Sequence, residues 1–256
     1  MLKNVAAERI RKELDGLLCG AAAPELLREF SDVVCVPIPE LAPCIGFRQF
    51  NFHHAYDVWE HSLHALAACE PEPALRLAAL LHDIGKPAVF SFDKQLVGHF
   101  YGHTVTGAAL SERILRRLHY DSKTVALVSG LIGAHGAALE GIGRRGMLRL
   151  VQRLGAERLE LLLRLRRADR LGKGTEPPEV VEADIAALQA LFLRVTAPDA
   201  CFCLSRLNLT GNDLLSLGIP AGKQIGRILD AALQAVIDGN VQNERQDLIE
   251  FAQKIR

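Results

Sequence analysis

The chain has 256 residues, a length that predicts one large domain or two small ones. Its 30 basic and 30 acidic residues give a formal net charge of zero, which excludes a chain-wide basic field for nucleic acid but not a local basic face. Hydrophobic residues make up 49% and aromatic residues only 5%, so the composition argues against disorder and favours an all-α fold, because strand-forming residues are scarce.

Apolar periodicity, helix caps and helix breakers predict helices along almost the whole chain. The expected helices span about residues 3–19, 24–30, 57–69, 74–84, 103–118, 122–134, 146–153, 155–171 and 179–194. The prolines within 31–52 predict a connector with short turns, and the loop to about residue 101 has room for a small hairpin. The tail from Thr210 is expected to form three short helices, divided at residues 218–220 and 239–240.

Neither a membrane span nor a secretory signal is expected. No stretch approaches the ~20 apolar residues of a span. Charges on both sides of the first helical pattern are unlike a signal peptide. The six cysteines contain no Cys-x-x-Cys pair, so we expect reduced thiols and a cytoplasmic location. Cys201 and Cys203 could bind a metal as a pair, but ordinary packing is favoured because no second pair exists.

Histidine and aspartate residues at apolar helix positions carry the chemistry of this sequence. They are His61, the adjacent pair His82-Asp83, His103, His135 and Asp169. Each histidine and Asp169 lies four or seven residues from apolar residues of its own helix, which predicts that they face the core. A buried carboxylate needs a strong partner, and a metal ion with imidazole ligands supplies one. The alternatives are a hydrogen-bonded core position for each histidine and a salt bridge from Asp169 to a neighbouring arginine.

The segments WEHSL, LLHDIGKP, YGHTVTG, IGAHG and RRADR resemble the motif of the HD superfamily of metal-dependent phosphohydrolases. The resemblance implies two metal positions that share Asp83. Metal one would be held by His61, His82, Asp83 and Asp169, and metal two by Asp83, His103 and His135. Two such ions would activate a water and neutralise phosphoryl oxygens, with Asp83 and Lys86 as catalytic residues. A solvated loop position is the alternative for Lys86. The mixed nitrogen and oxygen ligands suit Mn, Fe, Co, Ni or Zn, and Mg less well.

Longer segments resemble the HD region of bacterial tRNA nucleotidyltransferases, the CCA-adding enzymes, over nearly the whole chain. They include YDVWEHSLHAL, LAALLHDIGKP, FYGHTVTGA, the opening ERIRKELDGLL and the tail that begins LTGNDLLSLGIP. The implied fold is an all-α HD-domain bundle with a C-terminal helical extension. The expected regions are an N-terminal helical segment and connector (1–52), the HD domain (53–172) and the C-terminal helices (173–256).

The same resemblance has one clear departure. Those enzymes carry an N-terminal head with an Asp-x-Asp metal pair, whereas only seven residues precede Glu8 here and no Asp-x-Asp occurs in the 256 residues. Nucleotidyl transfer needs two carboxylates for magnesium, so we expect no such transfer by this chain alone.

Four further residues are candidates for substrate binding. They are His54, His99, Arg166 and Arg170. The two arginines belong to segment 144–173, whose ten basic and three acidic residues give a net charge of 10 − 3 = +7. Such a segment indicates either a phosphate-facing or RNA-facing surface or a solvated helix face, and the solvated face is favoured for most of it. Few aromatic residues are present to stack on single-stranded bases, which weakens the RNA interpretation.

The expected function is hydrolysis of a phosphomonoester or phosphodiester, such as a nucleotide or a 2′,3′-cyclic nucleotide, with two divalent ions. The alternative is a non-catalytic tRNA-binding module, or a partner of a separately encoded nucleotidyltransferase head. The complete set of six metal-type ligands favours hydrolysis, because a binding module has no need for them.

Overall fold

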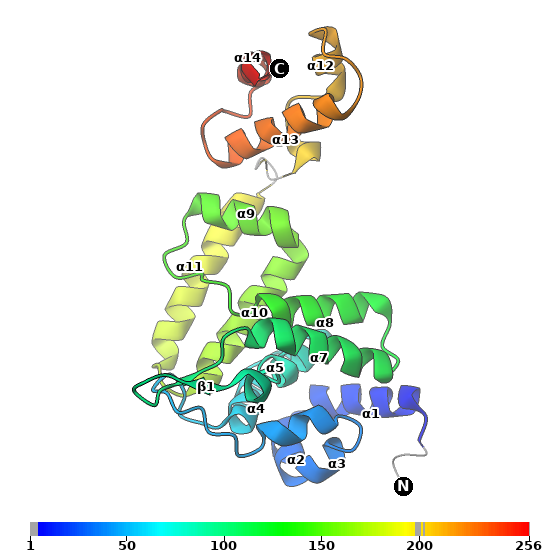
Figure 1. The fold of residues 1–256 in the computed structure, drawn as a ribbon, viewed down its shortest axis with the longest axis vertical. Helices are drawn as coiled ribbons and strands as arrows, with labels where there is room; N and C mark the ends of the chain where they lie inside the picture. The colour runs from blue at the N-terminus through cyan, green and yellow to red at the C-terminus, as the bar shows by residue number, and fades with distance from the viewer. Residues whose placement is uncertain (1–4, 198–200, 202, 256) are drawn as a thin grey trace. The chain divides into compact units, whose positions relative to one another are not determined.

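The computed structural model describes residues 5–197, 201 and 203–255, and within them the all-α fold expected from the sequence is confirmed (Figure 1). The α-helices are α1 (Ala7–Cys19), α2 (Ala23–Glu29), α3 (Ser31–Val34), α4 (Val58–Ala67), α5 (Pro73–Leu81), α6 (Lys86–Val89), α7 (His103–Arg117), α8 (Ser122–Ala134), α9 (Arg144–Leu154), α10 (Ala156–Lys173), α11 (Pro178–Thr196), α12 (Gly211–Ser216), α13 (Lys223–Ile237) and α14 (Arg245–Ile255). Short 3-10 helices span Pro39–Cys44 and Leu204–Arg206. Residues 3 and 4 of the first expected helix lie outside the described residues.

The chain folds into two compact units. Unit 1 contains Met1–Ala137 and Leu161–Ala186, and unit 2 contains Ala138–Glu160 and Ala187–Arg256. The dividing points fall inside α10 and α11. The functional boundaries expected after residues 52 and 172 stay a prediction. In the described part of the chain, no helix is both long and apolar enough to cross a membrane.

Helix α5 is the centre of unit 1. Its sequence PALRLAALL is apolar apart from Arg76, so the helix is stable only when other elements surround it. Helices α1, α4 and α8 pack against it, and every residue from Leu75 to Leu81 is buried. The guanidinium group of Arg76 donates hydrogen bonds to the carbonyls of Glu70 and Leu18. The residues that follow Leu81 are therefore placed in the interior.

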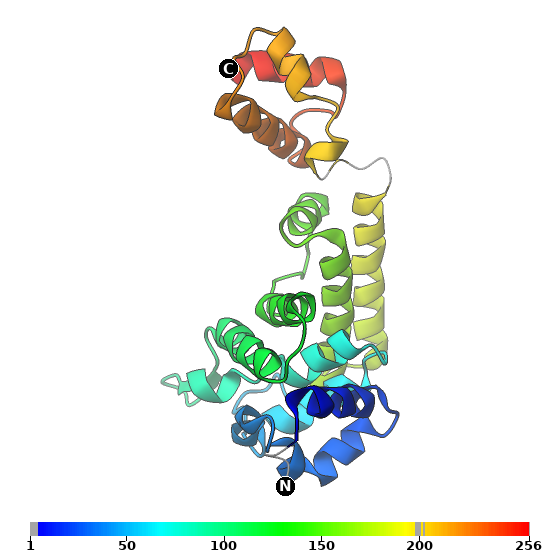
Figure 2. The same ribbon diagram turned by 90° about the vertical axis from the view of Figure 1, so that its right-hand side faces the viewer.

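Helices α7 and α8 and a short hairpin before α7 also belong to unit 1. Helices α7 and α8 lie side by side, as both views show (Figures 1 and 2). The side chain of Asp121 caps α8 by accepting hydrogen bonds from the backbone of Lys123 and Thr124. Before α7, strands β1 (Ser91–Phe92) and β2 (Gly98–His99) form an antiparallel hairpin in the loop where the sequence left room for one.

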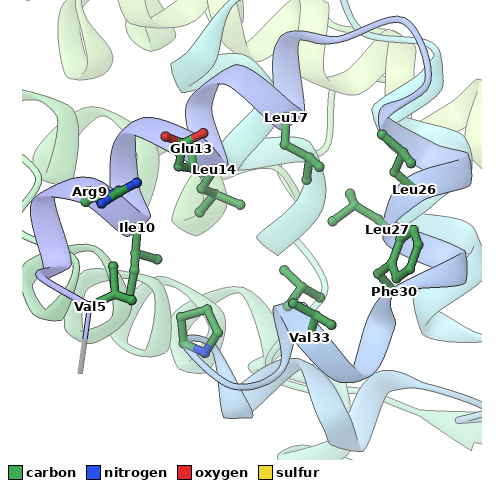
Figure 3. Close-up of a pocket in the computed structure, with 12 residues that line it drawn as sticks. Val5, Arg9, Ile10, Glu13, Leu14, Leu17, Leu26, Leu27, Phe30 and Val33 are labelled. Carbon is green, nitrogen blue, oxygen red and sulfur yellow. The ribbon is translucent and has the colours of Figure 1, made fainter. Parts of the chain in front are cut away.

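An apolar hollow lies between α1, α2 and α3 of unit 1. It has a volume of about 510 Å³, and Figure 3 shows the side chains of Leu14, Leu17, Leu27 and Phe30 along its walls. None of the predicted histidine and aspartate ligands lines this hollow. The hollow is therefore separate from the residues to which the sequence assigns chemistry.

The C-terminal part of unit 2 is a small helical group around α13. Helices α9, α12 and α14 contact α13, whose apolar face includes the buried residues Ile228, Leu233 and Ile237. Thr210 caps α12 through a reciprocal pair of hydrogen bonds with Asp213. The three tail helices expected from the sequence are confirmed, and the predicted breaks lie between them.

Candidate metal centre

The six residues predicted from the sequence meet inside unit 1. They come from five helices and their ends: His61 from α4, His82 and Asp83 after α5, His103 from the start of α7, His135 after α8 and Asp169 from α10. Five of the six are buried, and His103 is half-buried. Their proximity is a finding, whereas their role as metal ligands stays a prediction.

Glycines allow the helices to approach closely enough for these side chains to meet. A Cβ atom on Gly85 would lie only 2.4 Å from the carbonyl oxygen of His103. A Cβ atom on Gly172 would lie 2.7 Å from the backbone nitrogen of Ala65. Contacts this short exclude any larger residue without a backbone shift. Gly85 thus brings the end of α5 against α7, and Gly172 brings α10 against α4.

Asp83 lies between two groups of histidines. Its Oδ2 atom is 3.3 Å from Nε2 of His61 and 3.2 Å from Nε2 of His82. Its Oδ1 atom is 3.6 Å from Nε2 of both His103 and His135. Each carboxylate oxygen therefore faces a different group, as a residue shared between two metal positions would.

The first group is completed by Asp169. The Nε2 atoms of His61 and His82 lie 3.0 Å apart, and Oδ1 of Asp169 is 3.1 Å and 3.6 Å from them. In the second group, the Nε2 atoms of His103 and His135 lie 3.3 Å apart. These two groups, and a third made of His54, His61 and Asp83, have ligand atoms spaced closely enough to hold a metal ion.

Hydrogen bonds to carbonyl groups fix the tautomers of three histidines. The Nδ1 atoms of His82, His103 and His135 donate to the carbonyls of Ala79, Phe100 and Ile132 at 2.7–2.8 Å. Carbonyl oxygens only accept, so in each neutral imidazole the Nε2 atom carries a lone pair. Two lone pairs and a carboxylate oxygen then converge in the second group, an arrangement that a cation would stabilise. The donor set therefore fits a divalent metal.

Each carboxylate of the cluster also has its own lysine, a pairing that the sequence motifs did not predict. Nζ of Lys86 lies 2.6 Å from Asp83, and Nζ of Lys173 lies 3.5 Å from Asp169. Lys86 is buried, so its solvated alternative is wrong. The salt bridge considered for Asp169 exists, but its partner is a lysine one helical turn away rather than an arginine.

The pKa values show how strongly the cluster attracts positive charge. Burial raises the pKa of Asp83, but the charges of His82 and Lys86 outweigh burial and hold it well below its usual range. Burial acts on Asp169 in the same direction, and hydrogen bonds from His61 and His82 hold its pKa low. Burial lowers the pKa of His82, yet the two carboxylates raise it to about 10. A bound metal would replace such a proton, so metal binding and protonation compete here.

The two candidate substrate histidines have different positions. His54 lies beside the cluster, with its ring 5.2 Å from that of His61, and burial with the charge of Lys86 lowers its pKa to about 3. His99 instead pairs with Asp93 at 2.9 Å on the hairpin. His99 is therefore held by the hairpin, and only His54 is placed to influence the cluster.

The two arginines are held by other protein groups. Arg166 is buried and donates to the carbonyl of Ala137. Arg170 forms ion pairs with Glu176 and Asp184, so it does not pair with Asp169. Their expected substrate contacts stay a prediction that this geometry does not favour.

Sequence reasoning missed one polar residue near the cluster. Gln49 is buried, and its Oε1 atom accepts a hydrogen bond from Lys86 at 2.6 Å. It lies in the proline-rich connector, where no periodicity marks which residues point inward. The Cys201 and Cys203 pair belongs to no metal-type group among the described residues, and all six cysteines are free thiols.

Comparison with known proteins decides the family. A family model described as "tRNA nucleotidyltransferase domain 2 putative" matches residues 111–252, which is more than half of the chain. The chain belongs to this tRNA nucleotidyltransferase family. The resemblance to tRNA nucleotidyltransferases inferred from the sequence motifs is thereby confirmed.

Curated relatives agree with the family. The chain is 34% identical over 251 residues to the CC-adding tRNA nucleotidyltransferase of Thermus thermophilus, covering 94% of this chain and 55% of the relative. It is 34% identical over 254 residues to the A-adding tRNA nucleotidyltransferase of Deinococcus radiodurans, covering 92% and 56%. It is 30% identical over 191 residues to the Multifunctional CCA protein of an Azoarcus species, covering 69% and 45%. The chain thus spans about half the length of the curated relatives it matches.

The expected hydrolase activity is wrong. The family and the first two of these relatives are named as tRNA nucleotidyltransferases, which are transferases, and nothing supports an HD-type phosphohydrolase with a small phosphoester substrate. The catalytic roles expected for Asp83 and Lys86 were assigned for that hydrolysis, and they stay a prediction. The physical reason is that a cluster of buried ligands reports how charge is balanced in a core, and does not identify a reaction.

Proposed function

We propose that this chain is a tRNA-binding body region of a tRNA nucleotidyltransferase and works together with a nucleotidyltransferase head. The family match and the names of the relatives support this proposal. Nucleotidyl transfer itself would use carboxylates outside these 256 residues, since they contain no Asp-x-Asp pair.

The basic face of α9 is the surface on which tRNA would bind. Met147, Leu148 and Val151 bury one side of this helix, whereas its arginines are exposed. Arg149 is paired with Asp238 at 2.6 Å. The remaining three, Arg144, Arg145 and Arg153, form no ion pair with the described part of the chain.

Two of these arginines occupy an electrostatically unfavourable position. Arg144 and Arg145 begin α9, whose first turn contains no acidic residue. The backbone dipole makes a helix N-terminus positive, so cations there destabilise the helix. A phosphate bound at this end would be favoured by both the guanidinium groups and the free backbone N–H groups. This uncompensated charge is the observation that carries the proposal.

We also propose that the histidine and aspartate cluster holds divalent metal as a structural centre. Metal one would bind His61, His82, Asp83 and Asp169, and metal two would bind Asp83, His103 and His135. When bound, the ions would neutralise carboxylates and join helices of unit 1. Mn, Fe, Co, Ni and Zn suit the mixed nitrogen and oxygen ligands.

Equilibrium binding of a fluorescent tRNA tests the tRNA proposal. The triple variant Arg144→Ala/Arg145→Ala/Arg153→Ala is expected to bind at least about tenfold more weakly than the parent chain, because three guanidinium groups no longer meet phosphates. Arg116→Ala is the matched control, since Arg116 is an exposed helical arginine already paired with Glu112. Equal affinity of the triple variant and the parent chain would exclude α9 as the tRNA surface. Preference for tRNA over an unstructured RNA of equal length is expected as well.

A further inference from the structure

Lys86 lies in a cradle that uses every hydrogen of its ammonium group. Its Nζ atom is 2.6 Å from Oδ2 of Asp83, 2.6 Å from Oε1 of Gln49 and 3.3 Å from Nε2 of His54. A lysine ammonium has three N–H donors and no acceptor, and here three acceptors surround it. The side chain is only 5% exposed, so it is almost entirely enclosed by the protein.

The acceptors are themselves held in orientation. The amide nitrogen of Gln49 donates to the carbonyl of Tyr56, which turns Oε1 toward Lys86. Nδ1 of His54 bonds to the side-chain oxygen of Asn51 at 3.0 Å. An amide oxygen only accepts, so the proton of His54 is on Nδ1 and its Nε2 lone pair points to the ammonium. The cradle is thus arranged for a cation before any ligand arrives.

The cradle overlaps a group that is spaced for metal binding. His54, His61 and Asp83 have ligand atoms within 4.8 Å of one another, the third such group in the described residues. Two of these three residues also contact Lys86 directly. A divalent ion in this group and the lysine ammonium would compete for the same carboxylate oxygen and the same imidazole lone pair.

We propose that the ammonium of Lys86 is a built-in cation that fills a third position, formed by Oε1 of Gln49, Nε2 of His54 and Oδ2 of Asp83, and so limits the metal centre to two ions. His61 stays a ligand of metal one. This inference rests on the proposed metal centre only for the expected count of two ions in the parent chain. The exclusion itself follows from the contacts of Lys86. Without the ammonium, a nitrogen and two oxygen acceptors would converge with no hydrogen among them, and such a set attracts a hard or borderline divalent ion.

Metal counting with Co²⁺ alone tests the inference. Metal-free protein is dialysed against Co²⁺, and bound cobalt per chain is measured by elemental analysis and by its visible absorption. The parent chain is expected to bind two ions and Lys86→Ala three. Adding His54→Ala to Lys86→Ala removes an acceptor of the new site and should return the count to two. Lys86→Met is the matched control, because its apolar chain fills the space without charge and should leave the count at two.

The outcomes separate this inference from the proposed centre. Two ions in both the parent chain and Lys86→Ala, with unchanged affinity, would overturn the role of Lys86 and leave the centre in place. No ion in the parent chain but one His54-dependent ion in Lys86→Ala would overturn the centre and support the exclusion. No ion in either protein would overturn both. If Lys86→Ala does not fold, Lys86→Ser carries the same expectation, because its short side chain also vacates the space.

Discussion

The cluster of unit 1 and helix α9 of unit 2 both concentrate charge. The charges are paired with one another in the cluster, whereas most of those on α9 have no acidic partner in the described residues. In the cluster, Asp83 and Asp169 each have a lysine within 3.5 Å and several histidines around them. On α9, three of four arginines have no acidic partner among the described residues. Charge compensated inside the protein serves the fold, whereas uncompensated surface charge indicates a partner of opposite sign. This contrast favours RNA binding on α9 and a structural role for the cluster.

The largest expected effect comes from removing Asp83, the residue that both cluster groups share. Asp83→Ala should lower the unfolding free energy of metal-free protein by about 3–5 kcal/mol, because it leaves the Lys86 ammonium buried without its carboxylate. It should also reduce metal content at both positions. Denaturant unfolding and elemental analysis measure the two effects.

His135→Ala is the matched variant for Asp83→Ala, since His135 belongs to one group only. It should lose one ion and keep the other. If Asp83→Ala kept the unfolding free energy and the metal content of the parent chain, Asp83 would not be the residue that balances the positive charge of the cluster. The contrast with α9 would then lose its basis.

A smaller effect is expected from the glycine that brings α10 against α4. Gly172→Ala should cost about 1–3 kcal/mol, because its methyl group would overlap the backbone of Ala65 and move Asp169 away from His61. Gly16→Ala is the control: nothing lies within 4 Å of its added methyl, and alanine favours a helix by about 0.5–1 kcal/mol. If both variants shift stability in the same direction, the close approach does not position the cluster.

The smallest effect concerns a half-buried, compensated carboxylate of unit 2. Hydrogen bonds from Thr210 and Arg245 lower the pKa of Asp213 from 3.8 to about 2. A depressed pKa adds stability that is present above pH 3.8 and is lost as the pH falls toward 2. Asp213→Asn should therefore melt below the parent chain at pH 7, and the gap in Tm should shrink between about pH 4 and pH 2. A gap that is constant over this range would show that charge is not its source.

The helices and the proximity of the six ligand-type residues could both be predicted from the sequence, and the physical reason is the same. A buried helix face repeats every three or four residues, so polar residues at apolar positions such as His61 and Asp169 stand out. Gln49 carries no such signal because it lies in a connector without periodicity. Lys173 could have been found, since it lies one turn after Asp169 and pairs with it.

The main prediction of function, hydrolysis, was wrong, whereas its alternative, a tRNA-binding module or a partner of a nucleotidyltransferase head, fits the family better. The hydrolase prediction took a set of buried ligands as a reaction centre, although the pairing of Lys86 with Asp83 became visible only in three dimensions. The ten basic residues of 144–173 looked alike in the sequence. Their partners separate them: Arg164, Arg167 and Arg170 pair with acidic side chains, while Arg144, Arg145 and Arg153 have no such partner among the described residues.

The salt dependence of tRNA binding is the decisive measurement for α9 as an RNA-binding surface. The logarithm of the binding constant should fall linearly with the logarithm of salt concentration for the parent chain. The triple variant of Arg144, Arg145 and Arg153 should show a slope smaller by roughly 0.9 for each phosphate that is no longer neutralised, while Arg116→Ala keeps the parent slope. A triple variant with the parent slope and affinity, or a parent chain that binds no tRNA at low salt, would contradict the assignment of α9 as the tRNA-binding surface.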